Sequence, residues 1–215
     1  MTIEVKICGV NTLEAAHAAV GAGADYIGLV FYPPSPRAVT PAEAGAIARA
    51  LPAGVRKVGL FVDAGDALIA EALGAVGLDL LQFHGSEAPA RVAQVRARFG
   101  VPVMKAIKVA GASDVAGADA YLKVADRLLF DAKAPEDMPG ALPGGNALAF
   151  DWRLLAGRSW PLPWMLSGGL DPANVAEAAR VCGAPAVDVS SGVEDRPGVK
   201  NLGKIRAFVA AAKGC

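Results

Sequence analysis

Short apolar runs alternate along this chain with longer, alanine-rich stretches. Runs typical of buried parallel strands occur at eight places, over residues 3–8, 26–31, 57–62, 78–83, 103–107, 127–131, 164–167 and 186–190. Because a helix that joins two parallel strands crosses over right-handed, eight such units close most simply into a barrel. We therefore predict an α/β fold, a (β/α)8 TIM barrel, that forms a single domain over residues 1–215.

Signals for helix starts between the runs support this alternation. Thr40-Pro41-Ala42-Glu43 combines a cap, a first-turn proline and a reciprocal glutamate, Asn11 and Glu14 can form a capping pair, and Asp171 opens a further helix. Glycines mark the expected helix ends: Gly21, Gly23 and Gly100. A doubly wound open sheet uses the same alternation and is the alternative fold, but it would leave two edges and usually has fewer strands.

Composition restricts the class of protein. The 215 residues are 53% hydrophobic and 20% charged, which is enough to bury one substantial core. A formal net charge of zero provides no field for nucleic acid or an anionic membrane, and neither a signal peptide nor a membrane-spanning run is present. Cys8, Cys182 and Cys215 have no CxxC spacing, which favours a reducing, cytoplasmic location. We expect a small-molecule substrate, no cofactor and no metal, and a monomer or homodimer.

Strand alternation directs polar side chains from four strands into one cavity. If Cys8 points into the barrel, then Glu4 and Lys6 lie on its side, and Val5 and Ile7 face the helices. The same alternation places further polar side chains inward: Gln82, His84, Asp131, Asp188 and Ser190. The carboxyl ends of the strands, where such barrels place their chemistry, are therefore the predicted site.

Two kinds of loop follow the strands at this predicted site. The loops over residues 32–37 and 134–149 are longer than the rest, and long loops in compact domains tend to be functional. Gly168-Gly169 and Ser191-Gly192 follow the seventh and eighth strands, where barrels commonly bind phosphate through backbone N–H groups. Without a side chain, a glycine lets the backbone approach an anion, so we predict a phosphate site there.

Taken in order, these segments resemble the phosphoribosylanthranilate isomerase family of tryptophan biosynthesis. The matching segments are Lys6-Ile7-Cys8-Gly9, Ser35-Pro36-Arg37, Leu81-Gln82-Phe83-His84-Gly85, Phe130-Asp131, Phe150-Asp151-Trp152, Ser167-Gly168-Gly169-Leu170 with Asn174, and Val189-Ser190-Ser191-Gly192-Val193-Glu194. The resemblance implies an Amadori rearrangement of N-(5'-phosphoribosyl)anthranilate to 1-(2-carboxyphenylamino)-1-deoxyribulose 5-phosphate. It implies Asp131 as general acid and Cys8 as general base. Arg37, Gln82 and His84 are the expected substrate-binding residues, with Arg37 placed for the anthranilate carboxylate.

The implied chemistry makes a demand on Cys8. A cysteine with a pKa of about 8.5 is only a few per cent thiolate at pH 7, so we expect a neighbouring cation. Lys6 shares the parity of Cys8 but lies deeper in the barrel. We therefore interpret Lys6 as a structural lysine that influences the local field.

Each candidate residue has a structural alternative. Cys8 could be a small core residue, Asp131 could cap a strand end or pair with Lys133, and His84 could be a satisfied structural histidine. Arg37 could be a solvated loop charge. Asp171 is better interpreted as a helix cap than as a catalyst, and His17 as a surface residue.

Two departures from the family pattern leave other functions open. The turn before Phe150 is Gly144-Gly145-Asn146-Ala147-Leu148-Ala149, where a Gly-Gly-Thr-Gly type turn is expected, and Asn201 replaces an expected aspartate. A sister isomerase of histidine biosynthesis is one alternative, although it uses an aspartate at the position of Cys8. A non-catalytic barrel that binds a sugar phosphate is the other.

Overall fold

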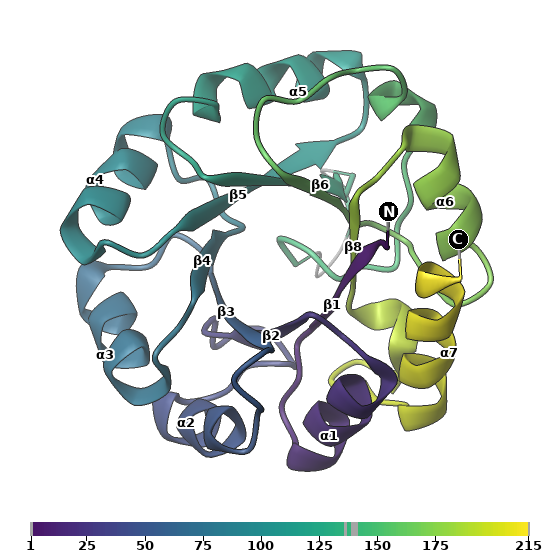
Figure 1. Cartoon of the computed structure of the whole chain (residues 1–215). Coiled ribbons are helices and arrows are strands. Elements are labelled where there is room, and N and C mark those ends of the chain that lie inside the picture. The colour runs from purple at the N-terminus through teal and green to yellow at the C-terminus, as the bar shows by residue number, and fades with distance from the viewer. Residues whose placement is uncertain (1, 136, 139–141, 215) are drawn as a thin grey trace.

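Eight parallel strands close into a barrel in sequence order (Figure 1). The computed structural model describes residues 2–135, 137–138 and 142–214. The strands are β1 (Glu4–Cys8), β2 (Tyr26–Val30), β3 (Arg56–Phe61), β4 (Leu80–Phe83), β5 (Val103–Val109), β6 (Arg127–Ala132), β7 (Trp164–Leu166) and β8 (Ala186–Val189). Because β8 pairs with β1, the barrel has no open edge, which confirms the predicted fold and excludes the open sheet.

A ring of helices surrounds the barrel (Figure 1). The helices are α1 (Leu13–Ala22), α2 (Pro41–Arg49), α3 (Asp66–Val76), α4 (Pro89–Phe99), α5 (Ala112–Gly117), α6 (Val175–Cys182) and α7 (Leu202–Lys213), with a 3-10 turn, η1 (Ala118–Tyr121), after α5. Helix α7 packs beside α1, and Lys213 forms a 2.9 Å ion pair with Asp25. This contact joins the two ends of the chain. No helix among the described residues is long and apolar enough to cross a membrane.

The regular alternation fails at two places. Between β6 and β7, the described residues form only a 3-10 helix, η2 (Trp152–Leu155), because proline and glycine recur through this segment. After β8 the chain forms η3 (Ser191–Val193) and an unpredicted hairpin, β9 (Glu194–Arg196) and β10 (Val199–Lys200). Both departures lie at the carboxyl end of the barrel. Four residues of the long loop 134–149, numbers 136 and 139–141, and Cys215 lie outside the described residues.

Half of the six predicted helix boundaries are confirmed, and three need correction. The capping box of Thr40 and Glu43 is present, and Gly23 and Gly100 end their helices in left-handed conformations. Thr12, not Asn11, caps α1, because the Asn11 side chain instead donates to the Gly198 carbonyl. The other two corrections are that Gly21 lies inside α1, and that the Asp171 side chain caps a turn before α6 instead of the helix itself.

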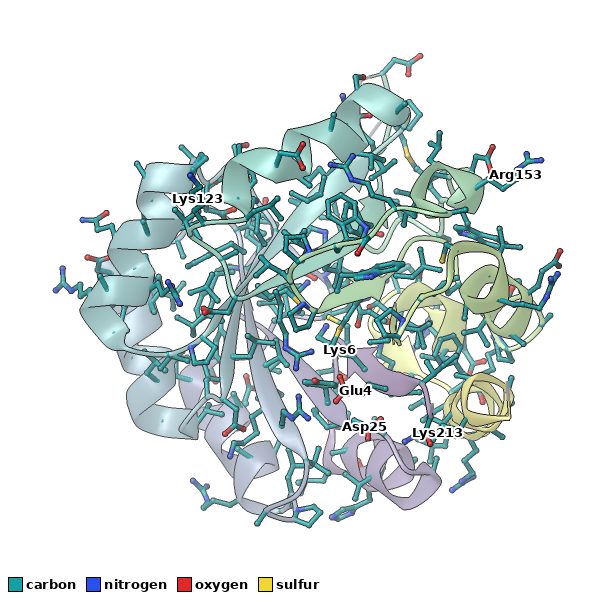
Figure 2. The ribbon with its side chains drawn as sticks, turned by 45° about the horizontal axis from the view of Figure 1, so that its top comes forward. Glu4, Lys6, Asp25, Lys123, Arg153 and Lys213 are labelled. Atoms are coloured by element: carbon teal, nitrogen blue, oxygen red, sulfur yellow. The ribbon has the colours of Figure 1, made fainter. Side chains whose placement is uncertain are left out.

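The barrel interior has a polar floor and an apolar middle layer, in the predicted alternation. At the amino ends of the strands, Glu4 accepts hydrogen bonds from Tyr26, Arg56 and Arg127. Above them lies a layer of buried side chains: Val58, Leu80, Met104, Ala106, Leu129, Met165 and Ala186, with the ring of Tyr26. Figure 2 shows Glu4 and Lys6 near the centre of the molecule, inside the ring of helices. Lys6, Cys8 and the other predicted polar side chains point inward above this layer.

Candidate active site

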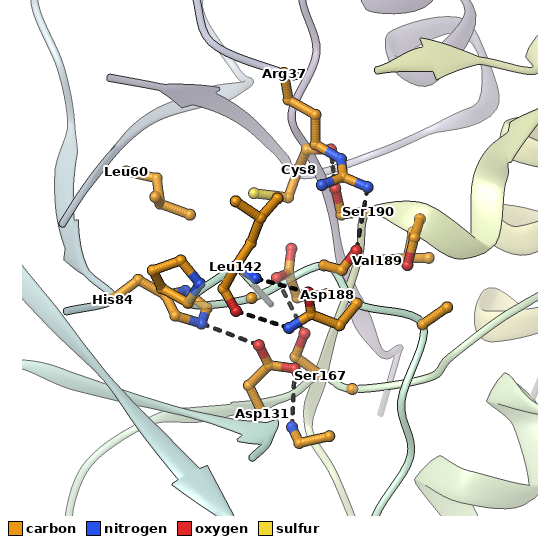
Figure 3. A pocket seen from close by; sticks show the side chains of 18 of the residues that line it. Cys8, Arg37, Leu60, His84, Asp131, Leu142, Ser167, Asp188, Val189 and Ser190 are labelled. Atoms are coloured by element: carbon orange, nitrogen blue, oxygen red, sulfur yellow. Dashed lines mark hydrogen bonds and ion pairs between the residues drawn. The ribbon is translucent and has the colours of Figure 1, made fainter. Parts of the chain in front are cut away.

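A pocket of about 740 Å³, counting the space at its mouth, opens at the carboxyl ends of the strands. Cys8 from β1 and Asp131 from β6 line it from different sides, as Figure 3 shows. Other predicted residues that line it are Arg37, His84, Gly168, Gly169 and Ser191. Its size is typical of a site for a small molecule. The fold therefore brings most of the predicted site residues together.

Lys6 lies close to Cys8, so its influence on the thiol is more direct than expected of a structural lysine deeper in the barrel. A Cβ atom added at Gly28 would lie 3.0 Å from both Cys8 Sγ and Lys6 Nζ, so the two groups occupy the space that this glycine leaves open. Lys6 is fully buried and donates a 2.8 Å hydrogen bond to Asp188 Oδ1. The Ser190 hydroxyl donates to the Cys8 carbonyl at 3.2 Å. Cys8 thus belongs to a buried ionic group.

The ionisation of Cys8 results from opposing effects. Burial raises the pKa of the thiol above its ordinary value, and the negative charge of Asp188 raises it further. Lys6 lowers the pKa through its charge and hydrogen bonding, and Lys200 also lowers it. Burial also lowers the pKa of Lys6, but Asp188 and Cys8 together raise it above its usual value. The expected cation is present, but its effect on the pKa of Cys8 does not fully offset those of burial and Asp188.

Asp131 is held by a buried histidine. Its Oδ2 lies 2.9 Å from His84 Nε2, and its Oδ1 accepts a 2.9 Å hydrogen bond from the N–H of Ala132. Lys133 instead pairs with Asp114, at 3.7 Å, so the predicted alternative pairing of Asp131 with Lys133 is wrong. The structure thus fixes the orientation of the Asp131 carboxyl at the edge of the pocket.

Gln82 does not line the pocket, which corrects the prediction that it binds substrate. Its side chain is fully buried behind His84, and its Nε2 lies 3.0 Å from His84 Nδ1. In this orientation the amide donates to Nδ1, so the histidine proton is on Nε2 and faces Asp131. Gln82 therefore positions the ring that touches the acid.

Arg37 is buried in a cluster of charges at the rim. Its Nε and Nη2 each donate a 2.8 Å hydrogen bond to Glu194, and Nη2 also donates to the Gly145 carbonyl at 3.2 Å. Lys200 donates to the same carboxylate at 2.8 Å. Burial raises the pKa of Glu194, but hydrogen bonds from Arg37 and the charge of Lys200 hold it below its usual range. The interpretation of Arg37 as a solvated charge is therefore wrong.

The atypical loop before Phe150 covers this pocket, and residues 142–148 line it. A Cβ at Gly144 would lie 2.6 Å from His84 Nε2, and one at Gly145 would lie 2.7 Å from Arg37 Nη1. Asn146 forms two side-chain hydrogen bonds with the backbone of Leu142, of 3.0 and 2.7 Å. Ala147 adopts a left-handed φ of 57°, a conformation that favours the glycine expected there. The glycines that remain are therefore those that contact the site.

The two glycine turns after β7 and β8 differ in role. Gly168 and Gly169 have φ values of 88° and 65° and line the pocket with Ser191. The backbone hydrogen bonds among the described residues use neither the N–H of Gly169 nor that of Ser191. Gly192 is not part of the lining, because a Cβ there would lie 1.9 Å from the Leu170 carbonyl oxygen. Gly192 thus joins the two loops, and its predicted contact with phosphate stays a prediction.

Comparison with known proteins agrees with this geometry. The family model described as N-(5'phosphoribosyl)anthranilate (PRA) isomerase matches residues 5–211. The chain belongs to the phosphoribosylanthranilate isomerase family. The isomerase of Paramagnetospirillum magneticum is 58% identical over 214 residues, covering 100% of this chain and 99% of the relative.

Solved structures of phosphoribosylanthranilate isomerases have the same fold. The enzyme of Thermotoga maritima has a TM-score of 0.88 at 38% identity, with 99% of this chain and 100% of that chain covered. A phosphoribosylanthranilate isomerase in complex with reduced 1-(o-carboxyphenylamino)-1-deoxyribulose 5-phosphate has a TM-score of 0.83 at 36% identity, with 99% and 100% covered.

Three charged residues of the site were not predicted to take part in it. Asp188 was placed inward without a role, and Glu194 was only part of a motif. Lys200 has no motif around it in the sequence, because it lies in β10 of a hairpin that the sequence does not predict. Asp171 caps a turn instead of the expected helix, and His17 is exposed, as expected. No three histidine, cysteine or acidic side chains converge as metal ligands in the described part of the chain.

Proposed function

We propose that this chain catalyses the Amadori rearrangement of N-(5'-phosphoribosyl)anthranilate, with Asp131 as general acid and Cys8 as general base. The observation that carries the proposal is that these two groups line one pocket from different sides, with the glycine turns after β7 and β8 at the same mouth. A reducing cytoplasm suits this role, because it keeps the Cys8 thiol free.

The reaction needs one proton donor and one proton acceptor. Asp131 gives its proton to the ring oxygen of the ribose, and the bond between that oxygen and C1' breaks to form a Schiff base. The Cys8 thiolate then takes the proton from C2', and the resulting enolamine tautomerises to the ketone. The pocket holds the sugar between β1 and β6, so each group reaches a different side of it.

The groups around the acid and base hold the substrate. The N–H groups of Gly169 and Ser191 are placed for the phosphate, since the left-handed glycines let the backbone approach an anion. Arg37 keeps its Nη1 toward Gly145 and the pocket, and its charge suits the anthranilate carboxylate. His84 orients Asp131 through the contact between its Nε2 and Asp131 Oδ2.

The test is to generate the substrate in situ from anthranilate and phosphoribosyl pyrophosphate and follow the loss of its fluorescence. We expect the wild type to consume it, and Cys8→Ala and Asp131→Asn to lose most activity while circular dichroism stays unchanged. Cys182→Ala is the matched control, because Cys182 is buried in α6 away from the pocket. Full activity in either site variant would refute that residue's role, and an inert wild type that binds product would favour a binding protein.

A further inference from the structure

We propose that Asp188 is a positioning residue that restrains the Cys8 thiolate by competing for Lys6. The inference rests on the proposed function, in which Cys8 is the base, and adds a control on how much of that base is available. On this proposal, the buried Lys6–Asp188 ion pair controls the ionisation of Cys8 and does not serve only to pack the barrel.

The geometry allows Lys6 to serve two anions. Lys6 and Asp188 are register partners on β1 and β8, and Nζ lies 2.8 Å from Oδ1. Gly28 on β2 faces Cys8 in register, and its missing side chain leaves the space in which Nζ and Sγ lie together. One fully buried ammonium therefore adjoins a carboxylate on one side and a thiol on the other.

The charges that face Cys8 come from several elements. Lys6 and Asp188 are nearest, Lys200 acts from β10, and Asp131 and His84 lie across the pocket. Arg37 packs against Gly9, where an added Cβ would lie 2.6 Å from its Cδ. Glu194 pairs with Lys200, which acts on the thiol through its charge alone, whereas Asp188 pairs with Lys6, the cation that also hydrogen-bonds to the thiol. Removal of the Asp188 charge should therefore act on Cys8 more than removal of any other.

The competition has a defined consequence for proton transfer. When Cys8 is a thiol, Asp188 neutralises Lys6, and the buried group carries no net charge. When Cys8 is a thiolate, the same three groups carry one buried negative charge, which Lys6 must share between two anions. Asp188 thus keeps Cys8 from becoming a permanent thiolate. Proton transfer is most efficient when the pKa of the base lies near the working pH. With its pKa kept in that range by Lys6 and Asp188, Cys8 can take the C2' proton and release it again.

The test uses alkylation of Cys8, which requires no substrate. In a Cys182→Ala/Cys215→Ala background Cys8 is the last of the three cysteines, and its rate of reaction with iodoacetamide is measured from pH 5 to 10. We expect Asp188→Asn to lower the midpoint pH by at least about one unit, and Lys6→Met to raise it, since an adjacent charge shifts a pKa by about one to three units. Asp195→Asn is the control, because this exposed acid pairs with Lys204 away from the pocket.

The direction of the shift decides the outcome. A structural role for the pair would disturb packing in both variants and move both midpoints the same way, or neither, and this would overturn the proposal. Should Lys6→Met not fold, Asp188→Asn alone decides, because only competition for Lys6 predicts a more reactive thiol. In a plot of kcat/KM against pH, the limb at low pH should shift in each variant in the same direction as the midpoint of alkylation. If Cys8→Ala were active, the proposed role of Cys8 as base would fail, but the alkylation result would still stand.

Discussion

Replacement of Gly192 by alanine tests how the two phosphate loops are held together. A Cβ at this position would lie 1.9 Å from the carbonyl oxygen of Leu170 and 3.2 Å from the Cα of Asp171. Carbon and oxygen atoms in close contact lie about 3.3 Å apart, so the loop after β7 must move by about 1.4 Å. The obstacle is backbone, which cannot turn aside as a flexible side chain can.

The magnitude follows from this displacement. Overpacking of a tight site costs about 1–3 kcal/mol, and at this chain length each kcal/mol lowers Tm by about 2–4 °C. We therefore expect Gly192→Ala to lower Tm by about 2–12 °C. Gly169 moves with Leu170, and a misplacement of about 1 Å can reduce kcat/KM by about 100-fold.

Thermal unfolding followed by circular dichroism gives Tm, and substrate fluorescence gives kcat/KM. Gly74→Ala is the matched control, because Gly74 lies inside α3 with nothing within 4 Å of an added Cβ. The control should gain about 0.5–1 kcal/mol of stability, as alanine favours a helix, and keep full activity. If Gly192→Ala matched this control in both measurements, the coupling of the two loops would be refuted.

Three further substitutions probe the rim of the pocket. Glu194→Gln should lower the free energy of unfolding by about 1–3 kcal/mol at pH 7. The Glu194 pKa is held down in the folded state, so this loss should shrink below about pH 4.3, and urea titrations showing a constant loss would contradict it. Ala147→Gly should raise stability by up to about 1 kcal/mol by relieving a left-handed alanine, and a lower Tm would count against this strain. Asn146→Ala should raise KM several-fold with little change in Tm, and an unchanged KM would show that its two bonds to Leu142 do not hold the loop.

The barrel could be predicted because its signals are local. Each strand is a short apolar run, and the inward position of Lys6, Cys8 and Asp188 follows from alternation alone. The long-range pairings were not predictable, since Arg37 and Glu194 are 157 positions apart and many charges could have met either one. Gln82 shows a different limit. Its side chain points to the same face of β4 as that of His84, as alternation predicts. It lies one layer deeper in the barrel, however, where it contacts the His84 ring and not the pocket, and alternation does not give this depth.

The apolar layer in the middle of the barrel separates the proposed catalytic mouth from the polar floor around Glu4. Val58, Leu80 and Met104 are apolar, and Tyr26 in the same layer turns its hydroxyl to Glu4 at the floor. We therefore expect a proton taken up at Cys8 to return to the bound molecule or, once the pocket empties, to solvent. In heavy water, deuterium would reach Cys8 through the same mouth of the pocket that admits the substrate. A filled pocket would then protect the transferred hydrogen from exchange.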